Sequence, residues 1–328
     1  MPFRFTRAIL CFAALVAVAC KDSGPDVKPA TVTIAPAPTG GLSIASGKSI
    51  NLSLTVANAA GNPVPAPDLS WTVTDPSVVT ISPTGTVTGV HVGQANVVAR
   101  VGDVSSAPLS VTVTPGTAAR VAIRTQPAGA ASGVPLSTQP VVEIQDVAGN
   151  LVTTSTATVT AIVATGGGTI TGSTATAVGG VATFASLTLS GVVGDRTLGF
   201  SAPGTTTATS AGLSLAPGTP ARLAVRTQPA GATSGSPLQT QPIVEIRDGA
   251  GNLVTGSSLI VTAGIGNGDG ILANATAAPS NGVATFAGLA ITGVPGERTL
   301  TFDATGLPTI SSAPFMLDRA PGSSATRR

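Results

Sequence analysis

The sequence predicts an all-β protein built from tandem β-sandwiches, and three observations lead there. Charged residues make up only 9% of the 328-residue chain and aromatic residues 3%, whereas 42% of the residues are apolar. The 40 glycines and 26 prolines are numerous but stay below the level of a disordered low-complexity chain. Apolar and polar residues alternate in short runs between Gly- and Pro-rich turns, a pattern typical of half-buried strands. The length suggests two or three domains.

The N-terminal segment 1–19 has the three parts of a secretory signal peptide. Arg4 and Arg7 form a basic start, an apolar run covers residues 8–19, and the run ends in small residues. The run is shorter than the ~20 residues that a membrane-spanning helix needs. We therefore predict that the signal peptide is cleaved and that the mature chain is exported.

Two kinds of cleavage fit the residues that follow. Ala17-Val18-Ala19 is an A-x-A site for ordinary secretion, but with Cys20 the same residues also resemble the lipobox of bacterial lipoproteins. In that family the cysteine thiol is alkylated with diacylglycerol and becomes the first residue; the family usually has Leu where this chain has Ala17. The other cysteine, Cys11, lies in the removed segment, and acylation would remove the liability of a lone thiol on Cys20. We predict lipidation of Cys20 and a flexible tether at 20–29, with plain secretion as the alternative.

An internal repeat indicates the domain organisation. Residues 119–129 return 102 residues later at 221–231, and the same spacing relates 139–144 to 241–246 without a gap. A repeat of this length is a whole domain rather than a solenoid unit. The linkers around Gly116 and Gly218 are short and contain Pro, which predicts semi-rigid joints.

These observations predict the following organisation: a signal peptide at 1–19, a tether at 20–29, sandwiches at 30–115, 119–217 and 219–318, and a disordered tail at 319–328.

A turn of common sequence occurs in all three predicted sandwiches. It covers 58–62, 146–150 and 248–252, and each copy follows a strand-like run. Asn or Asp opens such a turn by bonding its own backbone, and Gly and Asn tolerate a positive φ. A calcium loop would need more carboxylates, so we predict a hairpin turn. The strand-like runs around these turns alternate with period two, as at Ile50–Val56, Leu69–Val73, Leu109–Val113, Val159–Val163 and Leu213–Leu215.

The first sandwich resembles the bacterial Ig-like group 2 domain. The resemblance rests on a tryptophan strand at Trp71, the D-P-S-V segment at 75–78 and the G-T-V-T-G-V run at 85–90. The two repeats resemble, more loosely, the Ig-like modules of invasin- and intimin-type surface proteins through D-x-x-G-N-x-V and G-V-A-T-F. These resemblances imply tandem immunoglobulin-like β-sandwiches after a cleaved signal peptide and a surface location, and say little about a ligand.

The inventory of chemically active residues argues against catalysis. His91 is the only histidine and falls in a turn, so no histidine cluster can form. Glu143 and Glu245 occupy equivalent strand positions in the repeats, which we interpret as solvent-facing surface positions. Gly166–Gly168 and the stretch from Gly264 to Gly270 lack the strand and helix of a phosphate loop. Asn267–Gly270 offers calcium only one carboxylate, so we predict a turn there. Trp71 is predicted to lie in the core, near residues such as Leu52 and Val97, rather than on a sugar-binding surface.

Charge and patterning limit the partners. The net charge is only +2, and no basic stripe with stacking aromatics marks a nucleic-acid surface. We expect no cofactor and no metal site. The chain is predicted to be a non-enzymatic cell-envelope lipoprotein, at the outer membrane or cell surface, that forms a semi-rigid rod with a structural or adhesive role. The alternative is a displayed module that binds a surface polysaccharide or a protein; an enzyme is the third and least favoured hypothesis.

Overall fold

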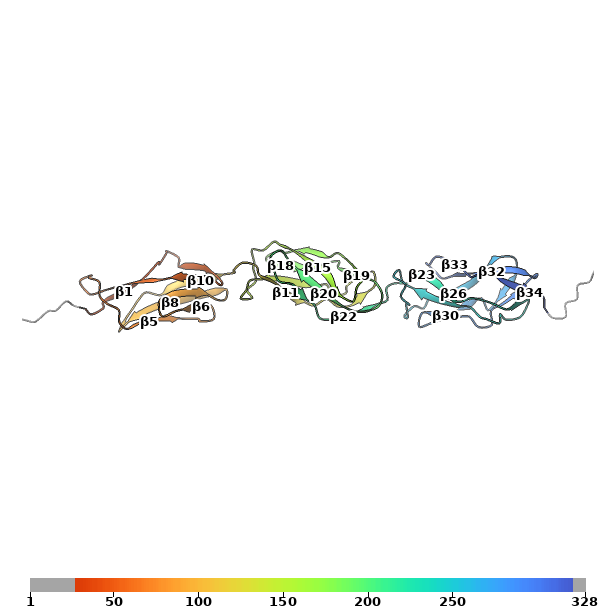
Figure 1. Cartoon of the computed structure of the whole chain (residues 1–328), viewed down its shortest axis with the longest axis horizontal. Coiled ribbons are helices and arrows are strands. Elements are labelled where there is room, and N and C mark those ends of the chain that lie inside the picture. Colours follow the sequence, from red (N-terminus) through yellow and green to blue (C-terminus); the bar gives the residue numbers. More distant parts are fainter. Residues whose placement is uncertain (1–26, 321–328) are drawn as a thin grey trace, which may run out of the picture. The chain divides into compact units, whose positions relative to one another are not determined.

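The computed structural model describes residues 27–320, which form strands and turns and contain no helix (Figure 1). This confirms the predicted fold class: the chain is an all-β series of β-sandwiches. It divides into two compact units, one made of the described residues up to Ile44 with Lys48–Val113, the other of Ala45–Gly47 with the described residues from Thr114. The second unit contains two separate hydrophobic cores. The domain bounds given above stay a prediction, because this division sets only the first sandwich apart.

The first sandwich arranges its strands around an aliphatic core. Its strands are β1 (Thr31–Ala35), β2 (Leu42–Ala45), β3 (Ser49–Asn51), β4 (Ser53–Ala57), β5 (Leu69–Val73), β6 (Val79–Ile81), β7 (Thr86–Gly89), β8 (Gly93–Val101), β9 (Val104–Ser105) and β10 (Leu109–Thr114). One sheet has the order β2-β10-β8-β5, with β9 beside β8; β3-β7-β6 and β1-β4 form the others. Along β10 the alternating Leu109, Val111 and Val113 are buried, so the period-two pattern does mark the core face.

The second sandwich is built from twelve strands around a core of its own. They are β11 (Arg120–Thr125), β12 (Ala130–Ala131), β13 (Val134–Pro135), β14 (Val141–Gln145), β15 (Thr158–Thr165), β16 (Thr169–Thr171), β17 (Thr174–Thr176), β18 (Val181–Thr183), β19 (Thr188–Ser190), β20 (Gly194–Ser201), β21 (Ala208–Thr209) and β22 (Leu213–Ala216). One sheet has the order β11-β14-β18, and the larger one runs β16-β19-β13-β12-β22-β20-β15-β17, with β21 on β20.

The third sandwich repeats this plan. Its strands are β23 (Arg222–Thr227), β24 (Ala232–Thr233), β25 (Ile243–Arg247), β26 (Val261–Asn267), β27 (Ile271–Ala273), β28 (Thr276–Ala277), β29 (Pro279–Ser280), β30 (Val283–Thr285), β31 (Ala290–Thr292), β32 (Gly296–Asp303), β33 (Ile310–Ser311) and β34 (Phe315–Asp318). The orders are β23-β25-β30-β29, β24-β34-β32-β26-β28 with β33 beside β32, and β27-β31.

Pairing register and core packing agree between the second and third sandwiches. Val121 pairs with Ile144 in one and Leu223 with Ile246 in the other, and all four residues are buried. In each core two phenylalanine rings meet with centroids 5.6 Å apart. Phe184, just after β18, meets Phe200 of β20, and Phe286, just after β30, meets Phe302 of β32. Full burial of such a side chain stabilises the fold by about 1.5–3 kcal/mol.

A β-bulge interrupts the first strand of each repeat. The register of β23 on β25 shifts between Val225 and Thr227, which leaves Arg226 as the extra, unpaired residue. The same shift in β11 leaves Arg124 in the equivalent position. Both arginines are exposed, so each bulge adds a cation to the outer face of its sheet.

Candidate functional site

The predicted lipidation residue, Cys20, lies outside the described residues. So do the signal peptide at 1–19, most of the tether at 20–29 and most of the tail at 319–328. The site described below therefore comes from residues 27–320.

His91 is exposed in the turn after β7, and its Nδ1 lies 3.0 Å from the carbonyl oxygen of Ser77.

Trp71 packs against the core of the first sandwich, as predicted. It does so from the edge strand β5, however, and is only half-buried. Glycine is favoured at position 85, because its φ is +85° and a Cβ there would lie 3.1 Å from the Trp71 ring. The indole Nε1 is buried and has no hydrogen-bond partner among the described residues. A small hollow of about 290 Å³ beside the ring is lined by Leu69, Ser70, Trp71, Ile81, Ser82 and Pro83.

In both repeats the shared turn is built around a buried aspartate carboxylate that accepts three hydrogen bonds. Asp248 is 1% exposed; its Oδ1 accepts the backbone N–H of Asn252 at 2.8 Å, and its Oδ2 accepts the Asn252 side-chain amide and the N–H of Gly218, each at 2.8 Å. Asp146 makes the same three contacts with Asn150 and Gly116 at 2.9 Å. The predicted hairpin turn is present, with Gly251 at a φ of +91°. Asn252, although asparagine tolerates a positive φ, does not adopt one here. Sequence reasoning missed that the carboxylate also fixes the linker.

These contacts determine the charge state of the two carboxylates. Burial by itself raises the pKa of Asp248, but hydrogen bonds from Gly218 and Asn252 outweigh it, so its pKa lies below the ordinary value. The pKa of Asp146 is lowered in the same way, against burial, by Asn150 and Gly116. Both turns therefore hold a carboxylate that is ionised at neutral pH.

The asparagine of the third turn makes two further contacts within the second unit. Its Nδ2 donates to the carbonyl oxygen of Gly191 at 2.8 Å, and its Oδ1 accepts the N–H of Val193 at 3.0 Å. The turn at 248–252 is thus used for structure, and its polar groups are already bonded.

The two Gly-rich turns make room for buried arginines. Arg196 and Arg298 are each 6% exposed and donate to backbone carbonyls, Arg298 to those of Val294 and Glu297. A Cβ on Gly268 would lie 2.5 Å from the Arg298 guanidinium. The turn predicted at 267–270 connects β26 to β27, with Asn267 as the last residue of β26, and both Gly-rich segments accommodate a buried arginine.

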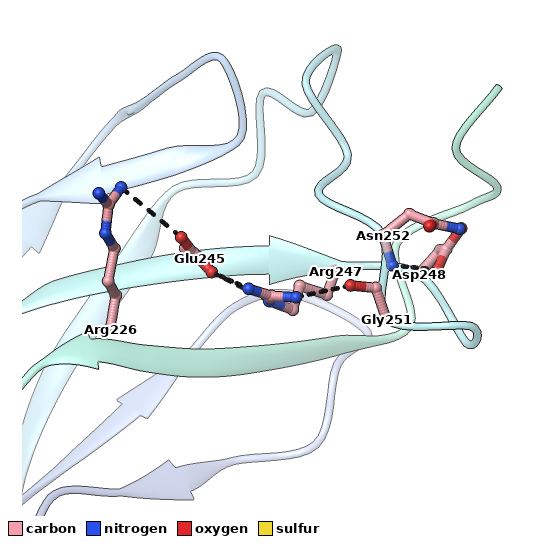
Figure 2. Close-up of polar contacts among 6 residues, drawn as sticks. All are labelled: Arg226, Glu245, Arg247, Asp248, Gly251 and Asn252. Atoms are coloured by element: carbon pink, nitrogen blue, oxygen red, sulfur yellow. Dashed lines mark hydrogen bonds and ion pairs between the residues drawn. The ribbon is translucent and has the colours of Figure 1, made fainter. Parts of the chain in front are cut away.

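The interpretation of Glu245 as a solvent-facing residue is wrong. Glu245 is 8% exposed, because long side chains from its own and the neighbouring strand cover it. Its Oε2 accepts Nε and Nη2 of Arg247 at 3.0 and 2.5 Å, and its Oε1 lies 3.7 Å from Nη1 of Arg226 (Figure 2). Arg247 also donates to the carbonyl oxygen of Gly251 at 2.6 Å. Glu143, its equivalent, is half-buried and lies 3.7 Å from Arg124.

An open hollow of about 680 Å³ lies over this cluster on the outer face of β23 and β25. Its charged lining residues are Arg222, Arg226, Glu245 and Arg247, so three guanidinium groups face one carboxylate. Between the two arginines of β23 stands Ala224, whose small side chain leaves the hollow open opposite Glu245. The alternation of apolar and polar residues did not indicate a site on this face. The signal that could have revealed it is that Arg247 replaces Gln145 at the 102-residue spacing.

Within residues 27–320 no group of three or more His, Cys, Asp and Glu side chains is placed to hold a metal ion. The same residues include no helix with the length and apolar character of a membrane span.

One protein family matches the first sandwich. Residues 27–113 match the bacterial Ig-like domain (group 2) family. The match covers the first sandwich, which is thus similar to bacterial Ig-like domains of group 2. The resemblance stated from the Trp71 strand and the D-P-S-V segment is confirmed for this part of the chain.

Several solved structures are similar to large parts of the chain at low identity. The Escherichia coli adhesin FdeC is 20% identical, with 88% of this chain and 96% of that chain covered and a TM-score of 0.39. Domains 4–9 of the surface layer protein SbsC are 19% identical, with 84% and 43% covered and a TM-score of 0.26. A β-glycosidase from Bacteroides vulgatus is 13% identical, with 62% and 25% covered and a TM-score of 0.27. None of these likenesses is close enough to assign a function, and no curated protein matches the chain.

Proposed function

We propose that this protein is a non-enzymatic lipoprotein of the cell envelope or cell surface, in which tandem Ig-like sandwiches form a semi-rigid rod with a structural or adhesive role. The observation that carries the proposal is the repeated turn in which buried Asp146 and Asp248 fix the linker residues Gly116 and Gly218. When each linker is hydrogen-bonded to the sandwich that follows it, the linker has less conformational freedom. A spacer or display element requires such restricted linkers. We assign the two repeats to the invasin/intimin type of Ig-like module.

Export and anchoring rest on the N-terminal sequence. The basic start, the apolar run and Ala17-Val18-Ala19-Cys20 support cleavage and lipidation at Cys20, which would attach the chain to the outer membrane or cell surface. A single exported cysteine at the mature N-terminus gives the anchor one attachment point.

Fractionation of cells tests the anchor. The wild-type chain should be recovered with membranes, and mass spectrometry of its N-terminal peptide should show acylated Cys20. Cys20→Ser should move the chain to the soluble fraction, while Ser23→Ala, a matched change in the tether, should leave it with the membranes. Wild type in the soluble fraction with an unmodified Cys20 would contradict lipidation and favour plain secretion.

The second candidate function is a displayed module that binds a polysaccharide or protein. The specific observation in its favour is the hollow with three arginines on the third sandwich.

A further inference from the structure

We propose that the hollow formed by Arg222, Arg226 and Arg247 on the third sandwich binds carboxylate groups of an acidic polysaccharide. This ligand class would account for the adhesive role, and the inference rests on the proposed function at the cell surface.

Arg222 is the first reason. It is exposed, and it has no hydrogen bond or ion pair with any described residue. In the strand ladder it stands directly opposite Arg247. Like charges in directly opposed positions destabilise a sheet, so the fold bears a cost here that an anion between the two guanidinium groups would relieve.

The second sandwich shows the same face without this conflict. There Gln145 takes the place of Arg247; its Oε1 accepts Nε of Arg120 at 3.1 Å and its Nε2 donates to Glu143 at 3.0 Å. The amide thus bridges cation and anion, and both are bonded. In the third sandwich Arg247 can donate to Glu245 but cannot accept from Arg222. The difference between the repeats therefore leaves one arginine free and adds one positive charge.

Glu245 prepares the remaining arginines for a ligand. Because it is buried and accepts two N–H groups of Arg247, it holds that guanidinium in place from below. Arg226, raised on its bulge, is held more loosely at 3.7 Å. A planar guanidinium binds a carboxylate through two parallel hydrogen bonds, and groups already held in place lose less entropy on binding. One carboxylate cannot neutralise three arginines, so the hollow stays positive.

The position of the hollow favours a polysaccharide over other polyanions. The hollow lies on the outer face of β23 and β25. A peptide that binds by strand addition would instead pair with the backbone along the edge of β23 and would leave that face uncovered. Its lining contains no aromatic residue on which a nucleic-acid base could stack. A chain of uronic acids presents carboxylates at regular spacing and keeps its hydroxyls in water above an open surface.

The test measures binding of polygalacturonate to the full exported chain carrying Cys20→Ser, so that lipid takes no part. Isothermal titration at low salt should show saturable binding that weakens as salt is added, because exposed charges are screened. Dextran, an uncharged polysaccharide, should not bind. Polyaspartate serves as the acidic-polypeptide arm.

Variants locate the site. Arg222→Gln and Arg247→Gln should each weaken binding about tenfold, the loss expected for one charge-assisted hydrogen bond. The matched changes Arg120→Gln and Arg124→Gln in the second sandwich should leave binding unchanged. Gln145→Arg, which recreates the third-sandwich arrangement in the second, should raise the number of polygalacturonate sites per chain. Arg222→Gln should also unfold at an equal or higher temperature than the parent, because it removes the opposed charges; this separates loss of a ligand contact from loss of folding.

Unchanged binding by Arg222→Gln and Arg247→Gln would overturn the proposal, as would equal binding of dextran. Tight binding of polyaspartate without binding of polygalacturonate would overturn the assignment to a polysaccharide. The fractionation experiment is independent: a chain that binds nothing can still be anchored, and a chain that is not anchored can still bind polygalacturonate.

Discussion

Replacing Asp248 by alanine removes the carboxylate that joins the third turn to its linker. Three donors lose their acceptor: the backbone N–H groups of Gly218 and Asn252 and the side-chain amide of Asn252. The site is enclosed, since Asp248 is 1% and Asn252 7% exposed, so water replaces the carboxylate poorly.

The cost follows from the donors left behind. A buried donor without an acceptor costs about 1–3 kcal/mol, and two backbone donors are affected. We expect Asp248→Ala to lower the free energy of unfolding of the third sandwich by about 3 kcal/mol, a large part of the 5–15 kcal/mol typical of a domain. For a domain of this size the midpoint should fall by about 10–20 °C. Asp248→Asn retains one acceptor oxygen and should cost about half as much.

The effect depends on pH in a definite direction. The pKa of Asp248 is lower in the folded state than in the unfolded chain, so the ionised carboxylate stabilises the fold above the unfolded pKa of about 3.9. This contribution is lost as the pH falls through the folded pKa. The stability difference between wild type and Asp248→Asn should be constant near neutral pH and shrink below about pH 4.

Calorimetry and hydrogen exchange measure the two parts of this prediction. The variant should show an earlier transition for one domain, with faster exchange of the Gly218 and Asn252 amides and no change at Gly116, the equivalent linker in the second sandwich. A variant with wild-type midpoint and wild-type exchange at Gly218 would refute the reasoning, since it would mean that water or another acceptor satisfies these donors.

Two further changes test the packing. Trp71→Ala should destabilise the first sandwich by about 3 kcal/mol, the lower end for loss of a large aromatic side chain, because the ring is half-buried. Guanidinium unfolding of the other two sandwiches should be unaltered. A freely quenched, red-shifted tryptophan emission in the wild type would contradict this placement. Gly166→Ala should lower the free energy of unfolding by at least about 1–2 kcal/mol, because the residue has a φ of +87° and its Cβ would lie 2.2 Å from the carbonyl oxygen of Asp195. Gly204→Ala is the control: Gly204 has a similar φ but open space around it, so this variant measures the cost of the backbone conformation alone. Equal losses of stability in the two variants would contradict the crowding at Gly166.

Much of the fold was predictable because it depends on local patterns. Period-two alternation identified the core faces, as at Leu109, Val111 and Val113, since each strand residue points to the face opposite its neighbour. The turn at 248–252 was predictable for the same reason: Asp and Gly adopt this geometry within five consecutive residues.

The candidate site was not predictable in this way, because it depends on contacts between distant segments. Alternation places Glu245 on the outer face of its strand but does not tell that Arg226, a bulge residue on another strand, and Arg247 cover it. The bond from Gly218 to Asp248 spans 30 residues and has no signature of its own. The one sign of this site in the sequence is that Arg247 of the second repeat replaces Gln145 of the first at the 102-residue spacing.

The matching registers of β11 on β14 and of β23 on β25 also bear on how the chain folds. Because the buried pairs are equivalent, β23 can pair with β14 on the same apolar face, and adjacent similar domains are prone to such misassembly. That exchanged pairing would place Arg222 opposite Gln145, an acceptor it lacks in the native ladder. The native partner is nearer along the chain, which is worth only about 1 kcal/mol in loop-closure entropy. Correct pairing in the two repeats therefore depends on each sandwich closing before its neighbour's strands become available.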